Sequence, residues 1–172
     1  MAIQRNRPPE HRTALLLDAF APPQWRQEEA AWRAGDITFK VMNEREFAYL
    51  PAGRRAEMER YVLEQARPRP GGSELVCFCL ERDIPLEIVS GGLDLYIHPL
   101  LERFGMGHLQ VHAMKHAKFS QGETIVPTYP EGVAVCDITG ACKCSRLWHY
   151  QEKGYRVVFV GDGNSDQCVA SK

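Results

Sequence analysis

The chain has 172 residues and a formal net charge of −1, with 21 Lys and Arg against 22 Asp and Glu. This balance gives no electrostatic reason to expect a nucleic-acid or membrane partner, and no apolar run approaches the roughly eighteen residues of a membrane-spanning helix. The basic, proline-containing amino terminus also lacks the apolar core of a signal peptide, so we expect a cytoplasmic protein with one core and at most a small additional unit.

The first predicted element is the end of a helix at residues 15–20. This stretch is apolar apart from Asp18, and Pro22 and Pro23 would stop a helix directly after it. A helical pattern then covers residues 24–66, where apolar residues recur at helical spacing between breaks rich in glycine and proline.

From residue 73 onward, helices and strands alternate. The predicted helices cover residues 73–82, 93–104 and 145–153, and another opens near residue 166. The predicted strands cover residues 86–89, 109–113 and 156–160, and a β-rich flap covers residues 118–135. Strands that alternate with helices indicate an α/β fold with a Rossmann-like, largely parallel sheet and right-handed connections.

Two acids follow the strand predicted at residues 156–160. Asp162 and Asp166 stand four residues apart in a glycine turn after this apolar run. Ligands of open α/β sheets collect at the carboxyl ends of strands, so Asp162 is a candidate metal-binding carboxylate. A plain turn, or an acid in the first turn of a helix, would explain the same residues without any chemistry.

A second candidate group can bind phosphate. Ser90, Gly91 and Gly92 follow the strand at residues 86–89, and Lys143 directly precedes a predicted helix. Glycines let the backbone approach a ligand, helix N–H groups attract phosphate, and lysine supplies a point charge. Ser90 as a helix cap and Lys143 as a solvated charge are the alternatives. The order Ser, Lys, Gly-Asp-x-x-x-Asp within one chain favours the phosphate interpretation.

This ordered set resembles the second, third and fourth motifs of the haloacid dehalogenase-like phosphatases. Within them, residues 20–25, 90–94 and 136–143 are similar to the methionine-salvage branch, the 2-hydroxy-3-keto-5-methylthiopentenyl-1-phosphate phosphatases. The phosphoserine phosphatases share less of this detail. The resemblance extends over residues 14–172.

The resemblance implies a domain organisation and a chemistry. It assigns residues 1–19 to a tail and the remnant of a first core helix, residues 20–67 to a small helical cap, and residues 68–172 to an α/β core that is incomplete at both ends. It also implies a Mg²⁺-dependent phosphomonoester hydrolase whose partner is a small phosphorylated metabolite.

The resemblance also implies residue roles. Ser90 would donate a hydrogen bond to the phosphoryl group beside the Gly91 and Gly92 backbone, and Lys143 would hold that group as a catalytic residue. Asp162 and Asp166 would be the metal residues, the first binding Mg²⁺ and the second supporting its shell.

One departure changes the expected activity. The family's first motif, a strand followed by Asp-x-Asp-Gly-Thr, is absent from the sequence. Asp18 also follows an apolar run, but Phe20 occupies the position that the motif's second Asp would have. We therefore expect this chain to be inactive, with Mg²⁺ weakly bound or absent. The alternatives are a pseudoenzyme that binds a phosphorylated ligand without turnover, and a scaffold protein. The motif's strand would lie in the middle of the sheet, so its loss would favour self-association through unpaired edges.

The six cysteines are expected to be thiols, because no secretory signal accompanies them. Cys136, Cys142 and Cys144 could supply three zinc ligands. However, the C-x-x-C spacing typical of such sites is missing. The favoured interpretation is that these cysteines are small buried residues of a flap.

Overall fold

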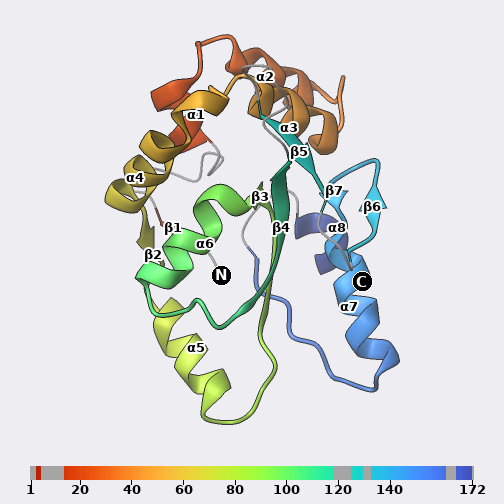
Figure 1. Ribbon diagram of the computed structural model, residues 1–172. Coiled ribbons are helices and arrows are strands. Elements are labelled where there is room, and N and C mark those ends of the chain that lie inside the picture. Colours follow the sequence, from red (N-terminus) through yellow and green to blue (C-terminus); the bar gives the residue numbers. More distant parts are fainter. Residues whose placement is uncertain (1–2, 5–13, 118–124, 130–132, 162–165, 172) are drawn as a thin grey trace.

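The computed structural model describes residues 3–4, 14–117, 125–129, 133–161 and 166–171 (Figure 1). Its first part is helical and consists of α1 (Ala14–Phe20), α2 (Trp25–Ala34), α3 (Phe39–Ala48), the short 3₁₀ helix η1 (Ala52–Arg54) and α4 (Arg55–Gln65). These helices gather at one end of the molecule in Figure 1. They confirm the helix predicted at residues 15–20 and the helical pattern after it.

Local sequence explains where these helices begin and end. α2 ends at Gly35, which adopts a left-handed φ of 84° that a side chain would disfavour. α3 begins after Thr38, whose Oγ1 accepts a hydrogen bond from the Val41 N–H at 3.3 Å. The short connection between the two helices lets them pack against each other.

The second part combines helices with short strands. Its helices are α5 (Gly72–Leu80), α6 (Asp94–Arg103), α7 (Lys143–Glu152) and α8 (Gln167–Ala170). Its sheet has the order β3-β4-β5, made of β3 (Glu87–Leu93), β4 (Gln110–Ala117) and β5 (Val126–Thr128). Two further pairs join β1 (Ile3–Gln4) to β2 (Arg67–Pro68) and β6 (Val135–Cys136) to β7 (Gly140–Ala141).

The β3-α6-β4 unit confirms the predicted α/β class. β3 and β4 are parallel, and α6 connects them, as a parallel pair requires. β5 adds to the other edge of β4 in antiparallel orientation. In Figure 1, α6 lies on one side of β3 and β4, and α7 lies on the other. The helices on both sides bury the apolar faces of these strands.

The largest hydrophobic core is shared between the two parts of the chain. Its fully buried large side chains come from both the amino-terminal helices and the β3-α6-β4 unit; they include Leu17, Phe47, Met58, Leu93, Leu101 and Met114. α4 packs against both α1 and α6, so it bridges the two parts. The boundary predicted near residue 67 remains a prediction.

The prediction of a strand at residues 156–160 is wrong. Within the described residues this segment pairs with no strand, and its apolar side chains are largely open to solvent: Val158 is 83% exposed and Val160 is 64% exposed. A β-strand needs a neighbour that accepts and donates its backbone hydrogen bonds. The apolar run predicts a buried strand, but the described structure forms no strand at these residues. The helix predicted to open near residue 166 is present as α8.

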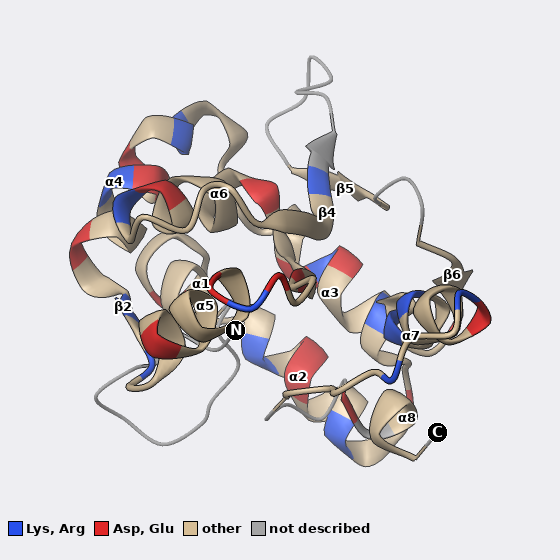
Figure 2. Ribbon diagram, turned by 90° about the horizontal axis from the view of Figure 1, so that it is seen from below, with Lys and Arg blue, Asp and Glu red and all other residues tan. Residues whose placement is uncertain are grey.

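Charged residues of both signs alternate on the helical surface. Figure 2 shows Lys or Arg next to Asp or Glu along α2 and along α4. Ion pairs on this surface include Arg33 with Glu29 within α2 at 2.5 Å, and Arg54 of η1 with Glu57 of α4 at 2.6 Å. None of the helices in the described ranges is both long and apolar enough to cross a membrane.

Candidate functional site

The Ser90-Gly91-Gly92 segment forms an irregular turn inside β3. The pairing with β4 shifts register between Val89 and Leu93, so these three residues bulge out of the ladder. Ser90 Oγ accepts a hydrogen bond from the Gly92 N–H at 3.0 Å. The Ser90 hydroxyl can still donate its own hydrogen, because a hydroxyl is both an acceptor and a donor.

Close packing explains the glycines of this turn. A Cβ on Gly92 would collide with the Tyr96 hydroxyl, and a Cβ on Gly91 would lie 3.3 Å from the Phe39 ring of α3. Here the requirement for glycine comes from space, since neither residue has a positive φ. The turn is thus held between α3 and α6.

Lys143 and Asp166, both predicted site residues, form an ion pair between Lys143 Nζ and Asp166 Oδ1. Their side chains are only 11% and 13% exposed. The Asp166 carboxylate also lies against Gly161, where a Cβ would be 2.5 Å from Oδ2. The structure therefore brings together the third and fourth predicted motifs. Asp162 lies outside the described residues.

The Lys143 end of α7 is close to the strand that carries Ser90. β7 leads into α7 through Cys142, and both β7 and α7 contact β3. Gly140 and Ala141 of β7 are buried at this contact. Lys143, at the start of α7, is therefore near the strand that contains the Ser90-Gly91-Gly92 turn.

A buried polar network fixes α7 against β3. Glu87 accepts hydrogen bonds from Arg146 Nε at 3.0 Å and Arg146 Nη2 at 2.8 Å, and a further one from the Tyr150 hydroxyl. His112 Nε2 of β4 lies 3.4 Å from the same carboxylate. Burial alone would raise the pKa of Glu87, but the bonds from Arg146 and Tyr150 hold it below its ordinary value. Because Arg146 lies one turn after Lys143, this network sets where α7 starts.

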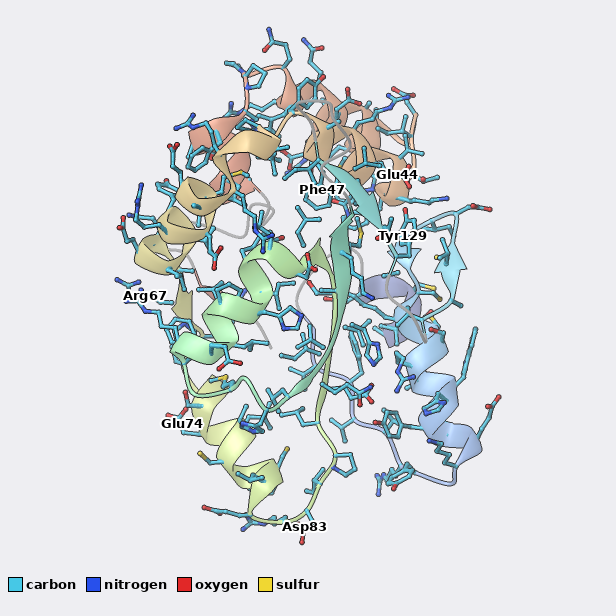
Figure 3. All side chains as sticks on the ribbon, viewed as in Figure 1. Glu44, Phe47, Arg67, Glu74, Asp83 and Tyr129 are labelled. Carbon is cyan, nitrogen blue, oxygen red and sulfur yellow. The ribbon has the colours of Figure 1, made fainter. Side chains whose placement is uncertain are left out.

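α3 also contacts the flap region, which here means Tyr129 after β5 and the β6–β7 hairpin. The Lys40 N–H donates to the Ile138 carbonyl at 2.9 Å, and Lys40 Nζ lies 3.6 Å from Asp137. The Tyr129 hydroxyl donates to Glu44 Oε1 at 2.5 Å, and the two side chains point toward each other in Figure 3. Burial and this bond raise the pKa of Tyr129. The helical part of the chain is therefore connected to both the turn and the flap.

Two polar side chains on α3 are buried without full hydrogen bonding. Asn43 Nδ2 is 3.5 Å from the Gly91 carbonyl, while Asn43 Oδ1 has no partner among the described residues. One turn later, Glu46 is fully buried and neither carboxylate oxygen has a partner there. Burial, followed by the charges of Glu29 and Glu28, raises the pKa of Glu46 to about 8. Glu46 is therefore mostly protonated at neutral pH.

The cysteines are free thiols, as predicted. Cys136 Sγ lies 3.0 Å from Thr139 Oγ1, and Cys144 Sγ lies 3.3 Å from Cys168 Sγ. Over the described ranges, no three or more His, Cys, Asp or Glu side chains converge as a metal site would require. The zinc alternative for Cys136, Cys142 and Cys144 has no support in this arrangement.

Of the two predicted metal residues, the structure describes only Asp166. Mg²⁺ is usually held by one or two carboxylates, with water and phosphate oxygens completing its octahedral shell. Asp166 is paired with Lys143, and in the part of the chain that the structure describes it belongs to no group of three or more potential metal ligands.

Sequence reasoning missed Glu87, Arg146 and Asn43. Glu87 interrupts the apolar run between Leu86 and Ile88, and a charged residue inside a buried strand signals a buried partner. That signal could have identified Glu87 but not Arg146, which is 59 positions away. Asn43 carries no comparable signal, because polar residues are common in helices.

Comparisons with known proteins show the family of this chain. The chain matches the haloacid dehalogenase-like hydrolase family over residues 3–171. It is 35% identical over 163 residues to the 2-hydroxy-3-keto-5-methylthiopentenyl-1-phosphate phosphatase of Geobacillus kaustophilus, covering 91% of this chain and 71% of that protein. It is 29% identical over 160 residues to the phosphatase of the same name from Brevibacillus brevis, covering 90% and 70%.

A longer relative is also similar over most of this chain. The chain is 32% identical over 151 residues to the bifunctional enzyme MtnB/MtnX of Bacillus licheniformis, covering 88% of this chain. It spans 35% of that relative's length. These similarities confirm the resemblance to the methionine-salvage phosphatases that the motifs indicated.

Proposed function

The chain belongs to the haloacid dehalogenase-like hydrolases, and from this we propose that it binds the phosphate group of a small phosphorylated metabolite between the Ser90-Gly91-Gly92 turn and Lys143. The names of its relatives support a methionine-salvage phosphate ester as that metabolite. In this proposal Ser90 and the turn donate hydrogen bonds, and Lys143 contributes positive charge.

The observation that carries the proposal is the bulged turn in β3 next to the start of α7. The bulge interrupts the pairing with β4 at these residues, and the two glycines leave the backbone there without side chains, so a ligand can approach it closely. Lys143 is a largely buried cation whose described partner, Asp166, carries a compensating charge. In this proposal, a bound phosphate and the Asp166 carboxylate would both contact Lys143 Nζ.

We further propose that these 172 residues bind the ester without hydrolysing it. The sequence contains no Asp-x-Asp-Gly-Thr to supply a nucleophile. Asp18 is the nearest candidate, but it lies on α1, where it pairs with Arg26 at 2.6 Å. Any Mg²⁺ binding would depend on Asp162 together with Asp166.

Inorganic phosphate tests the binding site directly. A ligand that binds only the folded state stabilises it by about 1.4 kcal/mol at tenfold excess over Kd, which raises Tm by a few degrees for a chain of this size. We expect phosphate to raise the Tm of the wild type and not that of Lys143→Ala. Lys153→Ala is the matched control, since Lys153 caps the opposite end of α7 and should keep the full shift.

A second readout separates the possible functions. With Mg²⁺ and an aryl phosphate, we expect no turnover above buffer. Turnover that disappears in Asp18→Asn would show an enzyme whose nucleophile lies on α1 and would refute the binding-only proposal. A wild-type Tm that ignores phosphate would favour a scaffold and would refute the phosphate site itself.

A further inference from the structure

Two thiols meet where α7 and α8 pack together. Cys144 Sγ and Cys168 Sγ are 3.3 Å apart, within hydrogen-bond contact. Cys144 is almost fully buried, whereas Cys168 is partly exposed. Both belong to a small second core with Leu147 and Val169, separate from the main one.

The position of this pair links it to the candidate site. Cys144 directly follows Lys143 in α7, and Cys168 lies two positions after Asp166 in α8. The Lys143–Asp166 ion pair and the thiol contact therefore connect the same two helices. These side-chain contacts therefore link the four-residue helix α8 to α7.

We propose that Cys144 and Cys168 form a disulfide when a low-molecular-weight disulfide such as oxidised glutathione is present, and that this bond joins α7 to α8 beside the Lys143–Asp166 ion pair. Forming it requires the sulfurs to approach by about 1.3 Å, to the usual bond length near 2.05 Å. Rotations of the two side chains can supply a movement of this size. The inference does not depend on phosphate binding.

The reaction proceeds by two thiol–disulfide exchanges. The more accessible Cys168 attacks oxidised glutathione as a thiolate, which forms a mixed disulfide and releases one reduced glutathione. Cys144 Sγ then attacks the Cys168 sulfur, loses its proton and releases the second glutathione. The two protein thiols are oxidised, and one glutathione disulfide is reduced to two thiols.

The burial of Cys144 makes the second step slow. Burial and the hydrogen bond with Cys168 raise the pKa of Cys144 to about 12, so little thiolate exists at neutral pH. The short contact offsets this, because the sulfur of Cys144 is already next to its target. We expect the bond to form over minutes to hours, within the ordinary range for uncatalysed exchange.

A neighbouring pair of thiols provides the competing outcome. Hydrogen bonds from Thr139 favour the thiolate of Cys136, although burial opposes it, and Cys142 is a further hydrogen-bond partner. Oxidation could therefore join Cys136 to Cys142 instead. Trypsin distinguishes the two bonds, because Cys136 and Cys142 share one peptide that ends at Lys143.

Peptide mapping of the wild-type chain after incubation with oxidised glutathione tests the proposal. The expected product has lost two hydrogens and yields the peptide of residues 144–146 joined to that of residues 157–172. A bond within the peptide ending at Lys143, with Cys144 and Cys168 still free, would overturn the proposal. A glutathione adduct on Cys168 that never resolves would overturn it as well.

Variants extend the test to stability. Oxidation should raise the Tm of the wild type by several degrees, since a cross-link restricts the unfolded chain. Cys168→Ser should abolish both the joined peptides and the Tm rise, while Cys77→Ser, which changes an exposed thiol on α5, should keep both. An equal rise in Tm on oxidation of Cys168→Ser would contradict the assignment, because that rise would then come from another bond. The wild-type map decides the question even if Cys144→Ser fails to fold.

Discussion

The surroundings of Glu46 strongly disfavour the charged form of its carboxyl group. Its carboxyl group is fully buried on α3, it has no described hydrogen-bond partner, and two further acids, Glu28 and Glu29, lie close enough to oppose its charge. A buried carboxyl in such surroundings stays protonated, because the neutral form costs less to remove from water. The pKa of about 8 in the folded chain compares with an ordinary value of 4.5.

This difference predicts how stability depends on pH. A raised folded-state pKa means that the folded chain holds the Glu46 proton where the unfolded chain has lost it. The contribution of Glu46 is therefore fully present below about pH 4.5 and is lost progressively as pH rises through 8. Each pKa unit corresponds to about 1.4 kcal/mol, so the loss reaches on the order of several kcal/mol.

Glu46→Gln should remove this dependence, because glutamine has the same shape and never ionises. We expect the variant to melt at the wild-type temperature near pH 5 and several degrees above it at pH 9. Thermal melts across this range measure the difference. Glu64→Gln, an exposed substitution on α4, should follow the wild type at every pH. A Glu46→Gln variant that is less stable than wild type at pH 9 would show that the carboxylate has a favourable partner.

Among the elements, α7 is joined to β3 by a largely buried polar contact. The Glu87 and Arg146 side chains are 9% and 11% exposed, and their two hydrogen bonds join β3 to α7. Removing one partner of a buried ion pair leaves the other charge uncompensated, which costs more than the pair itself contributes. The start of α7, with Lys143, should move or loosen when this contact is lost.

Arg146→Met keeps the length of the side chain and removes its charge. We expect it to lower the free energy of unfolding by about 3 kcal/mol at neutral pH, as measured by denaturant melts. The pKa of Glu87 is held below 4.5, so the pair's contribution is present above that pH and is lost as pH falls through the folded pKa. The difference between variant and wild type should therefore shrink in acid.

Arg54→Met provides the control for Arg146→Met. The Arg54–Glu57 pair has comparable geometry, at 2.6 Å, but both side chains are about half exposed. Solvent and salt screen exposed ion pairs, and holding their side chains in place costs entropy, so we expect little change in stability. Equal losses from the two substitutions would refute the special role of the Glu87 contact. An undiminished Arg146→Met effect in acid would refute its electrostatic origin.

Elements that depend on local pattern could be predicted from the sequence. The strand and helix on either side of the Ser90 turn, and the helix after Lys143, follow from apolar periodicity and turn residues within a few positions. The strand at residues 156–160 could not be settled this way, because a strand also depends on a distant neighbour. The Glu87–Arg146 contact was missed for the same reason, since no local pattern predicts which cation a buried acid will meet.

At the scale of the whole molecule, the segment at residues 155–160 exposes several large apolar side chains. Tyr155, Val158 and Val160 are each half exposed or more, and Trp148 on the neighbouring α7 is also exposed. Exposed apolar side chains that gather in one place are typical of contact sites. An extended segment that lacks a described strand partner can also pair with another chain through its backbone.

We therefore expect the chain to self-associate as its concentration rises, with the segment at residues 155–160 in the contact. Val158→Lys should shift the population toward monomer, because a charge is costly to bury between two chains. Size-exclusion chromatography with light scattering over a dilution series measures this. Ile138→Lys is the matched control, since Ile138 is 63% exposed, close to the 64% of Val160, but lies in the β6–β7 hairpin. A wild type that stays monomeric at every concentration, or an Ile138→Lys variant that dissociates equally well, would show that this segment is not the contact.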